Sequence, residues 1–417
     1  MRPDRQSLDH LRAALSEGAR ANLDLAVSKI VEAKTRNGCV VVVTGSGPNI
    51  HEGVTTLIAE LIRKNVVDGV ITSSAVVAHE MAGTLDRVKR IRIAESEDIG
   101  IPVSLLPRGR TFEITVLTAE TCPELREEIS VGWDLFDRMQ QRTGDVIIKA
   151  GGNMAWPMGY RTERLAREAQ EIAKQLGTTV EHVAGLGADP MTMIGAGARR
   201  GVPVLVSIPQ LVGGGAVGLA IGDAIPLSRR ARLVADLLQR ADVIVESAIA
   251  LSQEIHDGPF ETYTGHGIWA AWDHLRTYSL EHKTLVRIDL DPNLETAWKN
   301  ERQNSEVQKA VDLGLPKTKQ TGIPFRMEMS GFARLEGSIP ITADIGVIWP
   351  LIASELEEKL GVNLDFIPAP QETAHGERMR EWIVENVAYA NRRQMFEAAG
   401  SVPLSLGGAQ MKSGSHA

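Results

Sequence analysis

Residues 38–80 read GCVVVVTGSGPNIHEGVTTLIAELIRKNVVDGVITSSAVVAHE, and this stretch decides the fold. An apolar run over 40–43 ends in a glycine-rich loop, an amphipathic segment follows, and a second apolar run over 67–71 ends in Thr72-Ser73-Ser74. Short β-branched runs are typical of buried parallel strands, and glycine lets backbone N–H groups approach a ligand. The stretch therefore predicts a strand–loop–helix–strand unit that binds a nucleotide, with the positive end of the helix facing the ligand.

The glycine loop departs from the dinucleotide-binding pattern in one place. Gly45 and Gly47 fit the first two positions of G-x-G-x-x-G, but Gly53 comes too late to be the third. A plain α/β crossover is therefore the alternative to a dinucleotide site. We assign the loop to cofactor binding, and its residues are Gly45, Ser46, Gly47, Pro48 and Asn49.

Apolar runs and helical stretches alternate along the rest of the chain. Further runs lie at 113–117, 145–149, 202–208, 242–246, 284–290 and 340–343, and helical patterns lie at 160–176, 228–240 and 346–360. This alternation predicts an α/β fold with a doubly wound, mostly parallel Rossmann-like sheet and helices on both faces.

Three regions follow from the same pattern. Residues 1–37 form an N-terminal helical segment, and residues 38–370 form the Rossmann-like catalytic domain, in which 299–337 is an irregular excursion that could cover a site. Residues 371–417 form a C-terminal helix and a flexible tail.

Composition narrows the class of protein. The chain has 417 residues, 43% of them hydrophobic and 24% charged, which is ordinary for a globular protein. A net charge of −8 argues against a nucleic-acid-binding surface. No apolar run approaches the ~20 residues that span a bilayer, and the N-terminus does not read as a signal peptide. Two cysteines supply neither a disulfide framework nor a cysteine-based zinc site, so we expect a cytoplasmic protein with no metal site.

Glycine-rich or acidic loops follow several predicted strands. Ligands of open parallel sheets bind beyond the carboxyl ends of the strands, so these loops are expected to meet in one cleft. Besides the glycine loop, the predicted cofactor contacts are Ser73, Ser74, Gly152, Asn153, Gly214, Gly215, Asp289, Asp291 and Asp344. A carboxylate at a strand end could accept hydrogen bonds from ribose hydroxyls, although Asp291 could equally cap the following helix. Such a carboxylate favours NAD over NADP, because it would repel a 2′-phosphate.

Candidate catalytic residues lie near the second strand end. His79 is a candidate general base and Glu80 would orient it, with a solvated His–Glu pair as the alternative. Asp189 or Asp223 could hold a substrate ammonium group, although Asp189 could be only a helix cap. The sequence contains no HExxH, GxSxG or P-loop motif, which argues against those hydrolase classes.

Several segments resemble the deoxyhypusine-synthase-like NAD-binding superfamily. They are the opening unit, DVIIKAGGNMAWP at 145–157, GVPVLVSIPQLVGGGAVG at 201–218 and SIPITADIGVIWPLIASELE at 338–357. One branch, the deoxyhypusine and homospermidine synthases, carries an aminobutyl group on a lysine, and the corresponding stretch here, MSGFARLEGSIPITAD at 329–344, has none. The LOR/SDH-type branch, which includes NAD-dependent ornithine cyclodeaminases, is locally more similar, through SSAVVAHEM at 73–81, VRIDLDPNLETAW at 286–298 and ITADIGVIWPLI at 341–352.

This resemblance implies an NAD-dependent enzyme that acts on a small amine or amino acid through transient oxidation to an imine, as ornithine cyclodeaminases do. It also implies a homo-oligomer, with a tetramer favoured, and the amphipathic N-terminal segment adds weak support because its apolar face needs a partner surface. The alternatives are a deoxyhypusine-synthase-like transferase on a polyamine and a nucleotide-binding sensor without catalysis.

Overall fold

The computed structural model of the protein describes residues 1–45, 47–106, 109–119, 121–152, 155–209, 214–248, 280, 282–290, 309, 313 and 337–400. Three predicted cofactor contacts, Ser46, Asn153 and Asp291, lie outside the described residues. Nearly all of the predicted excursion at 299–337 and the predicted tail at 401–417 lie outside them too.

The centre of the molecule is a six-stranded parallel sheet with the strand order β6-β2-β1-β7-β8-β9. Its strands are β1 (Val40–Thr44), β2 (Gly69–Thr72), β6 (Val204–Val206), β7 (Val243–Ser247), β8 (Thr284–Asp289) and β9 (Ser338–Thr342). Counted along the chain within this sheet, the order is third, second, first, fourth, fifth, sixth, which is the order of dinucleotide-binding Rossmann folds. The α/β fold class predicted from the sequence is therefore confirmed.

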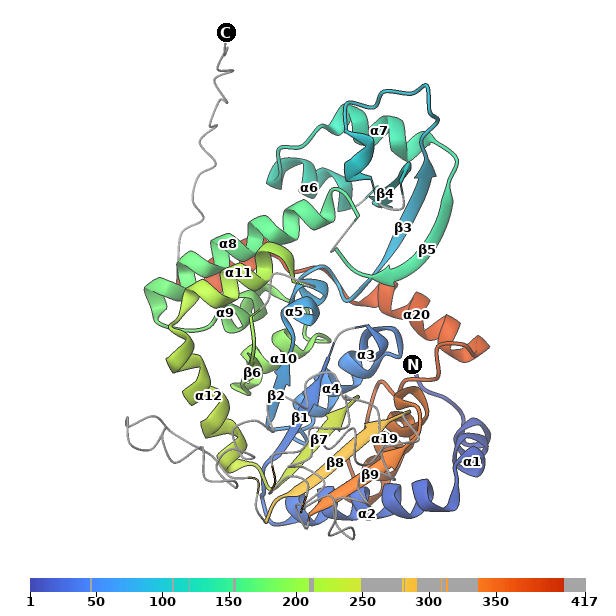
Figure 1. Ribbon diagram of the computed structural model, residues 1–417, viewed down its shortest axis with the longest axis vertical. Coiled ribbons are helices and arrows are strands. Elements are labelled where there is room, and N and C mark those ends of the chain that lie inside the picture. Colours follow the sequence, from blue (N-terminus) through green and yellow to red (C-terminus); the bar gives the residue numbers. More distant parts are fainter. Residues whose placement is uncertain are drawn as a thin grey trace.

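Helices cover both faces of this sheet (Figure 1). They include α2 (Glu17–Thr35), α4 (Val54–Arg63), α5 (Ser74–Met81), α8 (Met158–Leu176), α9 (Val180–Gly187), α10 (Met193–Arg200), α11 (Gly215–Ala224), α12 (Leu227–Arg240) and α19 (Ile345–Leu360). The side chains of β1 alternate between two cores, as the pleat requires. Val40 and Val42 pack in one core with α2 and α4, whereas Val41 and Val43 pack in a second core with α12.

A second, antiparallel sheet with the order β4-β3-β5 stands apart from the first. It contains β3 (Leu85–Arg92), β4 (Thr111–Thr115) and β5 (Asp145–Ala150). Helices α6 (Thr121–Glu128) and α7 (Trp133–Gln141) lie next to this sheet, and the short 3-10 helix η1 (Val103–Leu105) lies between β3 and β4 in the chain. The runs at 113–117 and 145–149 were expected in the parallel sheet, and that prediction is wrong. Strand β3 was not predicted, because its buried residues recur at every third position, without the alternation typical of a strand, and charged side chains lie between them.

The N-terminal helical segment consists of α1 (Arg5–Ala14) and α2. The apolar side chains of α2, including Leu23, Val27 and Ile30, are buried in the core, and α2 packs against β9 and α19. Its apolar face is thus covered by its own chain. The predicted homo-oligomer loses this part of its support and stays a prediction.

Two helices close the described chain, α20 (Ala374–Asn386) and α21 (Arg392–Ala398). Helix α20 contacts β3 and β5, and α21 contacts α9, so this segment bridges the small sheet and the helical layer of the large one.

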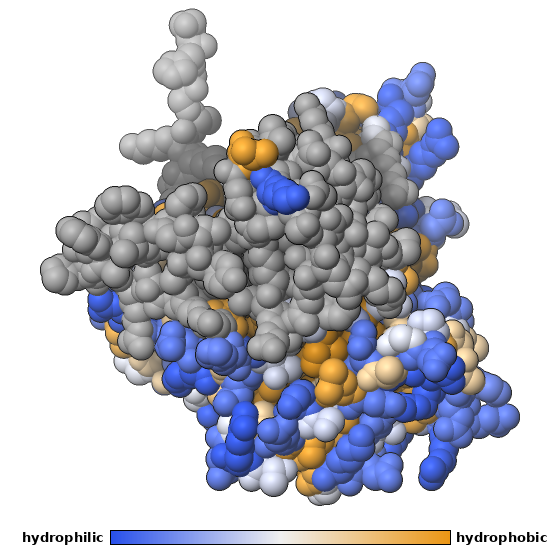
Figure 2. Space-filling model, turned by 60° about the horizontal axis from the view of Figure 1, so that its bottom comes forward, coloured by the Kyte–Doolittle hydropathy of each residue, from blue (hydrophilic) through white to orange (hydrophobic). Residues whose placement is uncertain are grey.

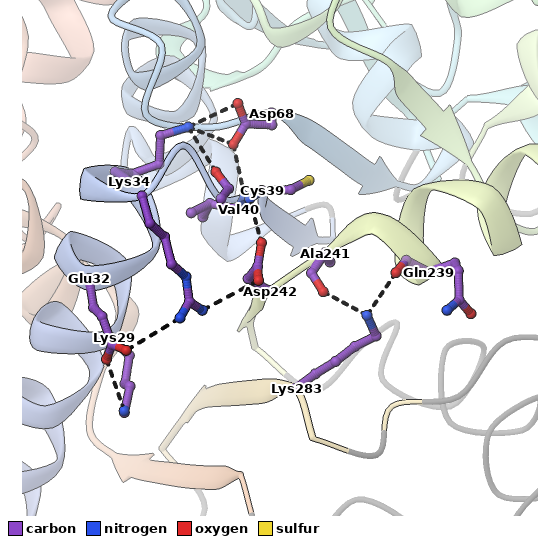
Figure 3. A network of polar contacts seen from close by, with 12 residues as sticks. Lys29, Glu32, Lys34, Cys39, Val40, Asp68, Gln239, Ala241, Asp242 and Lys283 are labelled. Carbon is purple, nitrogen blue, oxygen red and sulfur yellow. Dashed lines mark hydrogen bonds and ion pairs between the residues drawn. The ribbon is translucent and has the colours of Figure 1, made fainter.

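Partly buried ion pairs and hydrogen bonds from backbone N–H groups to carboxylates hold the amino edge of the large sheet (Figure 3). Asp68 accepts a hydrogen bond from the Val40 N–H (2.8 Å) and pairs with Lys34 (2.7 Å). Asp242 accepts from the Cys39 N–H (2.8 Å). The residues that precede β2 and β7 therefore anchor the start of β1 from both sides. These polar groups satisfy one another, which indicates a structural role for this edge.

Viewed from below, the described surface is mostly hydrophilic, with hydrophobic side chains gathered in a band near its middle (Figure 2). Within the described part of the chain, no helix combines the length and the apolar character needed to cross a bilayer.

Candidate functional site

The candidate site lies at the carboxyl edge of the large sheet, where the strand order changes direction between β1 and β7. The glycine loop leaves β1 at this point. Gly47 has a φ of +69°, and no described atom lies within 4 Å of the position that a Cβ would occupy there. The loop thus offers open space beside a backbone conformation that favours glycine.

A one-turn helix that the sequence did not predict lies between the loop and the predicted amphipathic helix. Helix α3 (Pro48–His51) makes a single turn, and α4 begins only after Gly53, which is in the left-handed conformation. The predicted amphipathic helix is α4, but α3 separates its N-terminus from the glycine loop. A ligand at this loop would meet backbone N–H groups and a one-turn helix, whose dipole is small.

A buried polar cluster fixes the loop to the end of β7. The Asn49 side-chain amide donates to the Ser247 carbonyl (3.1 Å), and the Ser247 hydroxyl is hydrogen-bonded to Asn49 Oδ1. The Trp349 indole N–H donates to the same hydroxyl (2.8 Å). The side chain of Asn49, a predicted cofactor contact, thus positions the loop. Trp349 lies in the core.

Hydroxyl groups mark three other strand ends. Thr72 is the last residue of β2, Ser207 follows β6, and Thr342 is the last residue of β9. Their hydroxyl oxygens are buried and have no hydrogen-bond partner among the described residues. Ser73 is committed to the fold, because its hydroxyl caps α5 by accepting from the Val76 N–H (3.3 Å). Buried hydroxyls without a partner among the described residues also occur inside α4, at Thr55 and Thr56, so this feature is not specific to the carboxyl edge.

His79 lies on α5, directly after β2, and its side chain is buried. Its Nδ1 lies 2.7 Å from the Gly151 carbonyl oxygen. A carbonyl only accepts hydrogen bonds, so Nδ1 carries the proton and Nε2 keeps its lone pair. Burial lowers the pKa of His79, and the charges of His51 and Lys149 lower it further. The structure therefore holds a neutral imidazole in one tautomer, which is the form of a general base.

Glu80 does not orient His79, contrary to the prediction from the sequence. Its carboxylate accepts from the Met193 N–H (2.8 Å) and the Ile194 N–H (3.0 Å) at the start of α10. Consecutive residues of a helix point about 100° apart, so neighbours in sequence have different partners here. Burial raises the pKa of Glu80 to about 7, and the two N–H groups oppose that rise. Glu80 joins α5 to α10.

The two predicted ammonium-binding residues also have other surroundings. Asp189 accepts from the Met191 N–H (2.8 Å) and the Ala388 N–H (3.2 Å), which stabilises the turn before α10 and attaches it to the C-terminal segment. The role of Asp189 is therefore close to the helix cap that the sequence allowed as its alternative. Asp223 is exposed on α11.

Sequence analysis missed a charged group beside His79. Lys149, at the end of β5, pairs with Glu113 (2.9 Å), and Arg90 pairs with the same carboxylate (2.7 Å). Burial alone would raise the pKa of Glu113, but hydrogen bonds from Lys149 and Arg90 lower it below its ordinary value. A lysine inside an apolar run, two residues before Gly151-Gly152, was the available signal.

Packing and backbone conformation explain two of the other predicted glycines, Gly152 and Gly215. A side chain at Gly152 would collide with Ala82, and its φ is +66°. A side chain at Gly215 would meet the carboxylate of Glu163. This carboxylate accepts a hydrogen bond from the N–H of the next residue, Ala216 (3.1 Å). These positions require glycine whether or not a cofactor approaches them.

The two predicted acidic residues that the structure describes, Asp289 and Asp344, lie at the ends of β8 and β9. Asp289 is buried at the end of β8, with β7 between it and β1. The ribose-binding acid of Rossmann folds ends the strand beside the first, which here is β2 and ends in Thr72. Asp344 caps α19 by accepting from the Gly346 N–H (2.6 Å), and burial raises its pKa. Among the described residues no cluster of potential metal ligands occurs.

Comparison with known proteins adds distant likenesses only. No protein-family model matches the chain, and no curated protein does. A putative LOR/SDH protein from Methanococcus maripaludis S2 is 12% identical with a TM-score of 0.38, over 87% of this chain and 74% of that one.

Two further solved structures are much longer than this chain. ArgZ, an arginine dihydrolase of the cyanobacterial ornithine–ammonia cycle, is 12% identical (TM-score 0.39), over 83% of this chain and 32% of its own. AgrE, solved with ornithine and NAD⁺, is 13% identical (TM-score 0.36), over 86% of this chain and 34% of its own. The chain thus spans about a third of the length of these two proteins. Likeness at this level establishes neither a shared activity nor a shared substrate.

Proposed function

We propose that this protein is an NAD-dependent enzyme that oxidises a small amine or amino acid transiently to an imine, in the manner of ornithine cyclodeaminases. The observation that carries the proposal is the strand order of the large sheet, with an open glycine loop at its switch point and a buried neutral imidazole on the neighbouring β2–α5 unit. The LOR/SDH-type resemblance of the sequence supports the same function, and we place the enzyme in the cytoplasm.

The carboxyl edge has features that fit a dinucleotide. The backbone around Gly47 would hold the pyrophosphate, because a Cβ-free position there leaves room for close approach. The unsatisfied hydroxyl of Thr72 ends the strand where Rossmann folds bind the ribose. NAD, when bound, supplies the hydride acceptor.

His79 would move the proton in this reaction. Oxidation removes a hydride from the carbon beside the substrate nitrogen, and the nitrogen loses a proton as the C=N bond forms. Nε2 of His79 is the available acceptor for that proton, since Nδ1 donates to Gly151. Burial, with a smaller contribution from nearby Lys149, would keep the imidazole neutral before the reaction.

Replacing Gly47 with valine should weaken NAD binding by ~10-fold or more, which is about 1.4 kcal/mol. Valine would fill the open space beside the loop and strain a residue whose φ is +69°. Isothermal titration calorimetry with NAD measures the effect.

The matched control is Gly201→Val. Gly201 has a φ of +66° and equally open surroundings, but it caps α10 before the amino end of β6, at the opposite edge of the sheet. It should lose stability as Gly47→Val does and keep its affinity for NAD. Equal affinities in both variants would remove the glycine loop from the site.

NAD should bind at least ~10-fold more tightly than NADP. A 2′-phosphate needs a nearby cation, and the segment from Gly69 to Ala78, which forms the end of β2 and the start of α5, contains no lysine or arginine. Parallel calorimetric titrations of the two cofactors provide the measurement, and tighter binding of NADP would contradict the proposed ribose site.

A further inference from the structure

The described strands form two sheets with four edges, and the chain itself closes or blocks three of them. At β6 the Glu181 carboxylate accepts from the Val206 N–H (2.8 Å), and the Arg230 guanidinium donates to the Val206 carbonyl (2.9 Å). At β9 the Asn22 side chain donates to the Pro340 carbonyl (2.6 Å), and proline has no N–H to offer to a further strand. Both edges of the large sheet thus carry groups that hinder pairing with another chain.

The small sheet has one closed edge and one open edge. At β4 the Trp156 N–H donates to the Glu113 carbonyl (3.0 Å), and the Trp156 carbonyl accepts from the Thr115 N–H (2.9 Å). At β5 every strand pairing in the described part of the chain is with β3, and β5 lies at the periphery of the molecule (Figure 1). The backbone groups on the outer side of β5 can therefore accept a strand from another molecule.

Strand β5 lacks the usual protection of an edge strand. Its sequence, DVIIKA at 145–150, contains no proline and no glycine. Val146 is 53% exposed, and Ile147 and Ile148 are partly exposed. The charge of Lys149 is engaged by Glu113 (2.9 Å). Natural edge strands are charged, bulged, interrupted by proline or covered, because an open apolar edge pairs with other chains. An unprotected edge beside three protected ones indicates a surface for strand pairing.

We propose that β5 pairs antiparallel with β5 of a second copy of this chain, which would join two three-stranded sheets into one six-stranded sheet. The two copies would be related by a two-fold axis that runs perpendicular to the sheet and passes between the two Ile147 residues. This contact would be one interface of the homo-oligomer predicted from the sequence. The inference does not depend on the proposed function.

The strand is complementary to itself in this register. A two-fold axis perpendicular to the sheet brings side chains of the same face opposite one another, so the numbers of opposite residues have an even sum. Centred on Ile147, the pairing sets Val146 opposite the partner's Ile148 and Asp145 opposite the partner's Lys149. Apolar pairs and opposite charges both stabilise antiparallel strands. Moving the centre by one residue in either direction would set Asp145 or Lys149 opposite Ile147, so the charges favour a second copy in this one register.

Lys149 can serve the partner's carboxylate as well as its own. Its ammonium group has three N–H donors, and the ion pair with Glu113 requires only one of them. Asp145, Ile147 and Lys149 alternate with Val146 and Ile148 along the strand, so the opposite charges meet on the face that carries Glu113.

The first test is the mass of the full chain by analytical ultracentrifugation at about 100 µM, because a single strand pair is a small interface of modest affinity. Wild-type protein should reach at least twice the 45.2 kDa of one chain. Val146→Lys should have half the wild-type mass, since a lysine on an edge strand opposes pairing. The control, Leu176→Lys, changes a leucine at the end of α8 that is equally exposed, at 53%, and should keep the wild-type mass. A wild-type protein that stays monomeric, or a Val146→Lys variant with the wild-type mass, would overturn the proposal.

Cysteine cross-linking under mild oxidation tests the register and does not rely on the stability of Val146→Lys. In Ile147→Cys the two introduced thiols would face each other across the axis, with Cα atoms about 4.5–5.5 Å apart, which is within disulfide range. In Asp145→Cys they would be at least ~13 Å apart, because four residues separate them along the strand, although this position is more exposed.

Ile147→Cys should therefore form a covalent dimer and Asp145→Cys should not. Wild-type protein, which has the free thiols of Cys39 and Cys122, gives the background. Equal cross-linking of the two variants, or none in Ile147→Cys, would overturn the pairing at β5.

Discussion

Replacing His79 with alanine is expected to lower turnover by ~10²–10⁴-fold, the range for loss of general acid–base catalysis, and to leave NAD affinity nearly unchanged. The buried ring is held by Gly151 in the tautomer that leaves Nε2 free to take a proton. Steady-state kinetics with saturating cofactor give the change in turnover, and calorimetry gives the affinity for NAD.

The pH dependence of turnover is an independent test of the role of His79. Burial lowers the pKa of His79 below its usual 6.5, so the imidazole is neutral at pH 7. It becomes protonated only as the pH falls below 6.5. Turnover should therefore fall on the acid side of pH 6.5, and this limb should be missing in His79→Ala.

A control and a contrary result sharpen this prediction. His182→Ala changes an exposed histidine on α9 and should retain full turnover. If His79→Ala weakens NAD binding and spares turnover at saturating cofactor, then His79 orders the cofactor and is not the base.

Replacing Arg230 with methionine is expected to lower the free energy of unfolding by about 3–5 kcal/mol, the usual effect of breaking a buried ion pair from one side. Both side chains of the Arg230–Glu181 pair are buried, and their charged atoms lie 2.5 Å apart. Arg230 also donates to the carbonyls of Val206 (2.9 Å) and Ile221 (3.0 Å), and Glu181 accepts from the Val206 N–H (2.8 Å). The pair thus ties α9, α11 and α12 to the end of β6, and its loss would leave Glu181 charged and unpaired.

Urea denaturation measures this effect, with Arg232→Met as the control on the exposed side of the same helix. The double variant Arg230→Met with Glu181→Leu should be more stable than Arg230→Met alone, because it removes the stranded charge. A loss below about 1 kcal/mol in Arg230→Met would mean that the pair is solvated and behaves as a surface ion pair.

The local pattern of the sequence predicted the large sheet well. The apolar runs at 40–43 and 67–71 fall on β1 and β2, and the helical patterns at 160–176, 228–240 and 346–360 fall on α8, α12 and α19. These elements are buried on both faces or are strongly amphipathic, so periodicity reveals them. The small sheet was not predicted, because β3 buries one residue in three and carries arginines and lysine between them.

The candidate site was harder to predict, because its contacts join distant parts of the chain. The glycine loop and His79 stand out locally, but the partner of His79 is 72 residues away, at Gly151. Glu80 is a neighbour of His79 in sequence and not in function, since its carboxylate faces a different helix. Lys149 is conspicuous as a lysine inside an apolar run, but the run does not indicate which distant residue lies near that lysine.

The most direct test of the proposed function is a single-turnover experiment that follows the absorbance of reduced nicotinamide. Enzyme and NAD are mixed in equal amounts with each of a panel of small diamines and amino acids, ornithine among them. We expect a transient rise in reduced nicotinamide with at least one of them, and no rise with that compound in His79→Ala. A protein that binds NAD tightly and never reduces it with any member of the panel would contradict the proposal and would indicate a nucleotide-binding sensor.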